Sequence, residues 1–194
     1  MAFLEMISAS DGPLTLAIAK AHGRIRTDKE DDLIQLYLDG VVEFAEDFIG
    51  LDIRDKEYKQ TGSQLGACVT LEASQVKSVA SIKYKKNGAL VVIPEAEYQL
   101  YKKLNLSTVN AVSNGSFPVM FPAGDGGPDG YEIVFSTGWV NMPAQLKNAI
   151  LNHFMFFYEN RGDAIAAGAS AGSGLISMPP ETERIYKQFR ILRV

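Results

Sequence analysis

The residues best suited to nucleophilic chemistry lie near the C-terminus. Residues 168–172 read Gly-Ala-Ser-Ala-Gly, which places Ser170 in the pattern of a hydrolase nucleophile elbow. That chemistry needs a strand-to-helix turn at the serine and a histidine base later in the chain. The flanking residues are instead rich in Gly and Ala, and both histidines, His22 and His153, precede Ser170. We therefore interpret the motif as a chance match, and keep a small serine hydrolase using Ser170 as the enzymatic alternative.

Metal and nucleotide sites also lack their ligands in this sequence. The single cysteine, Cys68, and the two histidines leave too few nitrogen and sulfur donors for a zinc site. Cys68 lies between Ala67 and Val69, which predicts a buried, inert thiol. His153 follows the apolar spacing of a helix, which is typical of a core histidine. No phosphate-binding GxxxxGK[ST] loop occurs. We expect no catalytic residue, no cofactor and no metal.

The composition is that of a globular protein. The 194 residues are 46% hydrophobic and 22% charged, enough for one domain with a real core. No apolar run approaches the length of a membrane-spanning helix, and residues 1–11 lack the basic start of a secretory signal. We therefore expect no membrane partner and synthesis in a reducing cytoplasm.

Charge is distributed unevenly along the chain. The formal net charge is −4, but residues 1–57 carry a net charge of −7 and residues 58–103 a net charge of +4. The basic residues alternate with apolar ones instead of forming the dense stripe of a nucleic-acid binder. Alternating acidic and basic segments suit head-to-tail contact between identical subunits, and an ordinary solvated surface explains them equally well.

Helical spacing is predicted in four segments, near residues 13–23, 29–49, 143–161 and 181–192. The second begins at an acidic cluster, residues 28–32, which opposes the positive end of the helix dipole. We expect its core face to consist of five residues at spacings of four and three: Leu33, Tyr37, Val41, Phe44 and Phe48.

The middle of the chain has the spacing of strands. Residues 76–85 alternate, Asn87-Gly88 is a hairpin signal, and residues 89–93 form the returning strand. Residues 105–130 read as a long loop, and residues 162–177 as a flexible Gly/Ala/Ser segment. The predicted fold class is α+β: a small bundle of about four helices with an inserted antiparallel β-hairpin region at 57–138. We expect a core over residues 1–161, and a flexible segment plus docking helix over 162–194.

Four stretches in this order resemble the head–tail connector (adaptor) family of tailed bacteriophages and prophages. The first is 14–25 with the acidic residues 28–32, the second is Phe48-Ile-Gly50, the third is 76–84 with Asn87-Gly88 and Tyr98, and the fourth is 134–139 with 142–150 and 157–161. The last contains a strand, a glycine turn, a helix started by proline, and a Tyr-Glu-Asn-Arg end.

The resemblance implies a non-enzymatic virion assembly protein at the head–tail junction. Such proteins form a ring of typically twelve copies under the portal protein. They extend the channel through which genomic DNA passes without sequence-specific binding, and they dock a stopper or tail-completion protein. The alternative within this class is that the chain is itself a stopper or tail-completion protein.

Candidate contacts follow from this resemblance and from the predicted terminal helix. We expect Ile185, Phe189 and Leu192 to anchor residues 162–194 on the portal or a neighbouring subunit. Glu159 and Arg161 are candidates for pairing across a subunit boundary. The acidic residues within 28–57 are candidates for lining the channel.

Overall fold

The computed structural model describes residues 2–10, 12–103, 107–112, 124–125, 127, 129–160 and 178–191. It divides the chain into two compact units. The helical unit comprises Asp11–Ile53 and Asn141–Val194, and the strand unit comprises Met1–Ser10 and Arg54–Val140. The sequence analysis instead divided the chain by expected role, into a core over residues 1–161 and a docking segment over residues 162–194. The docking role of residues 162–194 stays a prediction.

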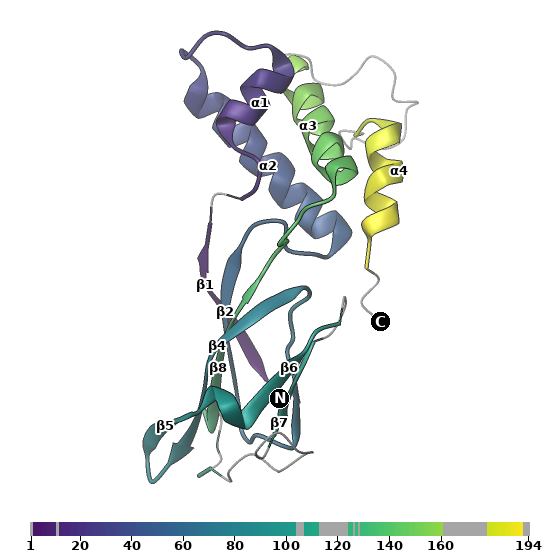
Figure 1. Ribbon diagram of the computed structural model, residues 1–194. Coiled ribbons are helices and arrows are strands. Elements are labelled where there is room, and N and C mark those ends of the chain that lie inside the picture. The colour runs from purple at the N-terminus through teal and green to yellow at the C-terminus, as the bar shows by residue number, and fades with distance from the viewer. Residues whose placement is uncertain are drawn as a thin grey trace. The chain divides into compact units, whose positions relative to one another are not determined.

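The helical unit contains four described helices (Figure 1). They are α1 (Leu16–Gly23), α2 (Asp31–Ile49), α3 (Ala144–Glu159) and α4 (Pro180–Phe189). The Thr15 side chain caps α1 by accepting from the Ile18 amide at 3.4 Å, and α2 ends at Gly50, which has φ of 76°. α2 contacts the other three helices, and α3 contacts both α1 and α4. The predicted set of four helices is confirmed.

The buried face of α2 differs from the predicted one. Leu33 and Phe44 are exposed, and Phe48 is half-buried. The apolar residues that are buried instead are Ile34, Leu38, Val41, Val42, Ala45 and Ile49. Most of this stripe lies one residue after the predicted one, which is a rotation of about 100° around the helix. Both stripes have helical spacing, so the pattern could not choose between them. The three helices packed against α2 make that choice.

The strand unit contains two antiparallel sheets (Figure 1). One has five strands in the order β1-β2-β8-β4-β5, with bounds Phe3–Ala9, Lys56–Gly62, Tyr131–Thr137, Val76–Lys86 and Ala89–Ile93. The other has the order β3-β7-β6, with bounds Cys68–Thr70, Thr108–Ala111 and Tyr98–Tyr101, and a short 3₁₀ helix, Glu95–Glu97, precedes β6. β8 is the central strand because it pairs with both β2 and β4.

One hydrophobic core joins the two sheets of the strand unit. Ile133 and Phe135 of β8 and Ile82 of β4 are fully buried, and they belong to one cluster with Leu71 and Val109. β8 alternates strictly between buried and half-buried residues. This alternation identifies one face of the large sheet as the inner face, which the small sheet covers.

The predicted hairpin is present as β4 and β5. Asn87 and Gly88 both have positive φ, 52° and 79°, as a two-residue primed turn requires. The Asp125 carboxylate accepts hydrogen bonds from the amides of Gly88 and Asn87 at 2.7 and 3.0 Å. These bonds hold the pKa of Asp125 below its usual range because they stabilise the charged form.

Two expectations for this unit are wrong. Residues 105–130 are not one loop, because they include β7 (Thr108–Ala111), whose four residues carry too little periodicity to be recognised. Cys68 is exposed at the start of β3, where Val69 is the residue that faces the core. The predicted β region, residues 57–138, also did not include β1. This N-terminal strand pairs with β2 and extends the five-stranded sheet.

Gly138, which follows β8, allows a direct test of the fold. Its φ is 113°, and an added Cβ would lie 2.7 Å from the Asp55 carboxylate and 2.8 Å from the Arg54 carbonyl oxygen. We expect Gly138→Ala to lower the free energy of unfolding by about 1–3 kcal/mol, measured by urea denaturation. Gly40→Ala is the control, since nothing lies within 4 Å of the added Cβ in α2. It should instead stabilise by up to about 1 kcal/mol. A neutral Gly138→Ala would contradict this geometry.

Candidate interaction surfaces

The residues predicted to make interfaces are found in different environments. Ile185 of α4 is only 8% exposed, Phe189 is half-buried, and Glu159 is exposed at the end of α3. Arg161 and Leu192 lie outside the described residues. Ser170 and the rest of the segment 162–177 lie outside them too. The described part of the C-terminal region therefore contributes Ile185 to the core of the helical unit.

A cluster of rings around His153 holds α4 against the other helices. The His153 side chain, 1% exposed, has its Nδ1 3.3 Å from the Tyr186 hydroxyl. The ring of Phe44 meets it edge-on at 5.3 Å, and the Phe157 ring lies 5.0 Å from it. Phe48 of α2 packs on Tyr186 at 5.9 Å. The expectation of a core histidine is confirmed.

The His153 imidazole is neutral at physiological pH. Burial lowers the pKa of His153 from 6.5 to about 4, because the apolar surroundings disfavour its charged form. Burial likewise raises the pKa of the Tyr186 hydroxyl well above its usual value. The contact between His153 and Tyr186 links α3 to α4.

The outward side of α4 is charged. Arg184 and Lys187 are exposed, and they pair along the helix with Glu181 at 2.6 Å and Glu183 at 2.7 Å. Such exposed pairs contribute little stability, and the lysine and arginine stay accessible to a partner. The chain after α4 is fixed to α2, since the Ile191 amide donates to the Ile49 carbonyl at 2.8 Å.

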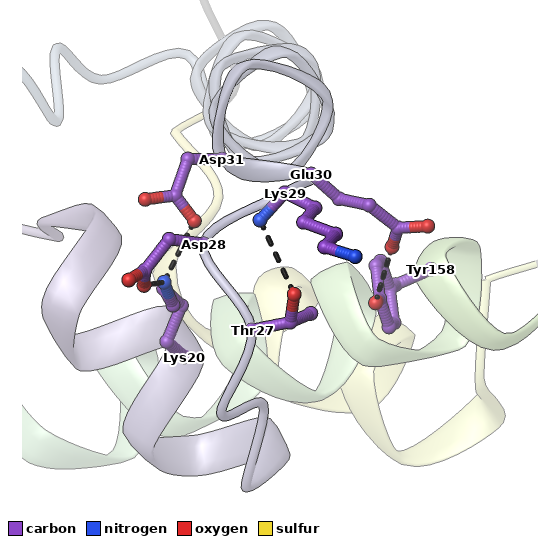
Figure 2. Close-up of polar contacts among 7 residues, drawn as sticks. All are labelled: Lys20, Thr27, Asp28, Lys29, Glu30, Asp31 and Tyr158. Atoms are coloured by element: carbon purple, nitrogen blue, oxygen red, sulfur yellow. Dashed lines mark hydrogen bonds and ion pairs between the residues drawn. The ribbon is translucent and has the colours of Figure 1, made fainter.

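The acidic cluster 28–32 is used in contacts inside the helical unit (Figure 2). Lys20 of α1 lies 2.5 Å from the Asp28 carboxylate and 2.7 Å from the Asp31 carboxylate. The Tyr158 hydroxyl of α3 donates to Glu30 at 2.9 Å. The hydrogen bond with Lys20 holds the pKa of Asp28 below its usual range. Asp31, in the first turn of α2, also fits the predicted interaction with the helix dipole.

The remaining acids of α2 divide into two groups. Glu46 is buried and accepts from the Ile53 amide at 2.8 Å. Three others repeat at a spacing of four along the outer side, where Asp39 is half-buried and Glu43 and Asp47 are exposed. We call Asp39, Glu43 and Asp47 the acidic stripe of α2. Together with the exposed Asp32 in the first turn, it is the part of the predicted acidic region 28–57 that stays accessible on this helix.

Sequence reasoning missed the apolar residues at the two edges of the five-stranded sheet. In β1 the exposed large apolar residues are Phe3, Met6 and Ile7, and in β5 they are Leu90, Val91 and Val92. The order of strands places β1 and β5 at opposite edges. Residues 89–93 were predicted as a returning strand, but nothing in the sequence shows which strands lie at an edge.

The described residues hold no group of three or more His, Cys, Asp and Glu side chains arranged for a metal ion. Within the same part of the chain, no helix combines the length and the apolar character needed to cross a membrane.

Three chains from solved structures of gene transfer agent (GTA) particles share this fold. The first, from "Neck of empty GTA particle computed with C6 symmetry", has a TM-score of 0.67, is 22% identical, and the alignment covers 99% of this chain and 97% of that one. Chains from "Virion of native gene transfer agent (GTA) particle" and "Neck of native GTA particle computed with C12 symmetry" have TM-scores of 0.65 and 0.64 with the same identity and coverage. No curated protein matches the sequence significantly.

The fold is thus one found in structures of phage-like necks. More specifically, residues 13–93 match the family model described as "Phage gp6-like head-tail connector protein". The match covers about two fifths of the chain, from the start of the helical region through the β4–β5 hairpin. The resemblance found in the sequence is confirmed.

The buried His153 predicts a specific pH dependence of stability. Because its pKa is about 4 in the folded protein and 6.5 when exposed, the unfolded state binds more protons between these values. Stability is complete above about pH 6.5 and should fall by about 1–3 kcal/mol as the pH drops towards 4. Urea denaturation at several pH values measures this loss.

A pair of variants isolates the contribution of His153 to the pH dependence. His153→Gln should flatten the slope of stability against pH between 6.5 and 4, whatever its effect on stability at pH 7. His22→Gln is the control, because the His22 side chain is exposed, and it should keep the wild-type slope. Equal slopes for wild type and His153→Gln would show that His153 is not the group responsible.

Proposed function

We propose that copies of this chain form a ring at the head–tail junction of a phage or phage-like particle, beneath the portal protein. The ring extends the DNA channel and docks the next neck component, a stopper or tail-completion protein. The family match over residues 13–93 carries this proposal. The fold shared with chains from C6- and C12-symmetric necks supports it. Twelve copies is the expected number.

The charges of the helical unit support head-to-tail assembly. A ring of identical subunits joins two different patches, so each copy must carry two complementary surfaces. The acidic stripe of α2 and the exposed Arg184 and Lys187 of α4, which also pair with glutamates of their own helix, are side chains of opposite sign on one unit. Complementary charges of this kind favour correct encounter and register more than they add affinity.

The acidic stripe is also suited to a DNA channel. Negative side chains repel phosphates, so DNA passes without being held. A given carboxylate serves either the channel or the contact between subunits. We propose that some of the three side chains Asp39, Glu43 and Asp47 face the axis of the ring, and that these line the DNA channel.

Docking to the portal is assigned to the C-terminal region, residues 162–194. Ile185 reaches a partner only if α4 leaves the bundle, because it is buried there. The outward residues Arg184 and Lys187 are accessible without any rearrangement. We therefore centre docking on this outer side of α4. Phe189, Leu192, Glu159 and Arg161 remain the proposed neighbouring contacts.

Co-sedimentation with purified portal rings tests the proposal. Wild-type protein should sediment with the rings, and the double variant Arg184→Glu/Lys187→Glu should lose most of this binding, about tenfold or more. Deleting α4 is a poorer test, because Tyr186 and Ile185 belong to the core. Lys102→Glu, a charge reversal at an exposed site in the strand unit, is the matched control and should bind normally.

The outcomes separate the parts of the proposal. Normal binding of the double variant to portal rings would show that the outer side of α4 is not the docking surface. Wild-type protein that ignores portal rings but binds a stopper or tail-completion protein would place the chain lower in the neck. Wild-type protein that binds no neck component would contradict the function itself.

A further inference from the structure

Both edges of the five-stranded sheet are open and apolar. Phe3 on β1 is 69% exposed and Val92 on β5 is 59% exposed, and Met6, Ile7, Leu90 and Val91 are exposed beside them. In the part of the chain that the structure describes, no further strand pairs with the outer side of β1 or β5. An exposed apolar edge strand offers unpaired amide and carbonyl groups to another chain, and proteins usually avoid leaving one open.

The outer face of this sheet carries two cross-strand ion pairs, two residues apart along the strands. Glu5 of β1 pairs with Lys59 of β2 at 2.5 Å, and Glu132 of β8 pairs with Lys83 of β4 at 2.7 Å. These residues share one face, because Glu5 lies opposite Lys59 and Lys83 opposite Glu132 in the strand register. The acid Glu5 therefore lies on the edge strand β1, and the bases Lys83 and Lys85 lie on β4, next to the opposite edge strand β5.

The two edges therefore complement each other in charge as well as in apolar character. When β1 of a second copy runs beside β5 with Phe3 next to Leu90, Glu5 of that copy lies next to Val92 and one strand away from Lys83. Apolar side chains would meet on the same face, with Phe3 of one copy near Leu90 or Val92 of the other, since Leu90 and Val92 lie opposite Lys85 and Lys83. A different protein would not offer a β1 edge for β5 together with a β5 edge for β1, as a second copy of this chain does.

We propose that β5 of one copy and β1 of the next pair as neighbouring strands, so that the five-stranded sheets form one continuous sheet around the ring. This inference rests on the proposed ring and names the surface that closes it. Every copy uses both of its edges, and a closed ring leaves neither open. Main-chain hydrogen bonds supply the attraction, as when an extended segment adds to a sheet edge.

The direction of the new pair follows from the topology. All neighbouring strands within the sheet are antiparallel, so β1 and β5, which are separated by three strands, run in the same direction. A rotation that keeps the same face outward and places the next β1 beyond β5 preserves that direction. The intersubunit pair is therefore parallel. The bulge between Met6 and Ser8 restricts regular pairing to the first half of β1.

Engineered disulfides test the pairing in the full-length chain. Phe3→Cys is combined with Val92→Cys, or with Leu90→Cys for the second register, in a Cys68→Ser background because Cys68 is exposed. Within one copy, β1 and β5 are four strand spacings apart, about 19 Å, too far for a disulfide. Every bond formed on mild oxidation of the concentrated protein therefore joins two copies.

We expect at least one of the two double variants to give a ladder of disulfide-linked multimers on non-reducing gels, and neither single variant to do so. Mixing the two single variants of that pair should give mainly heterodimers. The control combines Val92→Cys with Val140→Cys, an exposed apolar residue that is not on an edge strand, and should give no ladder. Circular dichroism and thermal melting of the reduced proteins verify that each variant folds.

The remaining outcomes overturn the inference in distinguishable ways. Wild-type rings in electron micrographs without cross-links in either double variant would show that the ring closes through other surfaces, and the proposed function would stand. Dimers from Phe3→Cys alone would show that β1 pairs with itself around a two-fold axis. Neither rings nor cross-links at any concentration would contradict both this inference and the proposed ring.

Discussion

The contact between His153 and Tyr186 decides which surfaces the helical unit presents. His153 lies in a cage of aromatic rings from α2, α3 and α4, and its neutral imidazole meets the Tyr186 hydroxyl without an intervening charge. With Tyr186 and Ile185 buried, the charged residues of α4 must lie on the other side of the helix. α4 is thus an integral part of the bundle, and the side chains that it leaves accessible are mainly charged.

A second constraint acts in the strand unit. The inner face of the large sheet is covered by the small one, and its outer face is satisfied by cross-strand ion pairs, so neither face needs a partner. The edges do. A structural protein that works as a ring has a use for two open edges that a monomer would have to protect, because ring closure covers one with the other. In the proposed ring, assembly depends on features that would be liabilities in an isolated subunit.

Much of this fold could be predicted from the sequence because its signals are local. Thr15, Gly50 and Asn87-Gly88 each specify a cap or a turn through their own conformational preferences. The buried face of α2 could not be predicted in this way. Phe44 and Ala45 both belong to apolar stripes with helical spacing, and only the position of the neighbouring helices determines that Ala45 is the buried one. Four-residue strands such as β7 are defined by pairing between distant segments, and the sequence shows no trace of that pairing.

The same distinction applies to the candidate site. The family resemblance and the core role of His153 were accessible because they depend on ordered motifs and on apolar spacing. Ile185 was assigned to a partner because an amphipathic helix looks the same whether its apolar side faces another protein or its own bundle. The edges marked by Phe3 and Val92 needed the order of strands, which arises only from the assembled sheet.

The most direct test of the account is electron microscopy of the wild-type protein mixed with portal rings, with light scattering to give the mass of the complexes. The account predicts a collar of added density on one face of each portal ring, with rotational symmetry and a mass that corresponds to a closed ring of this chain. Portal rings of unchanged outline and mass, with the protein remaining monomeric beside them, would contradict it.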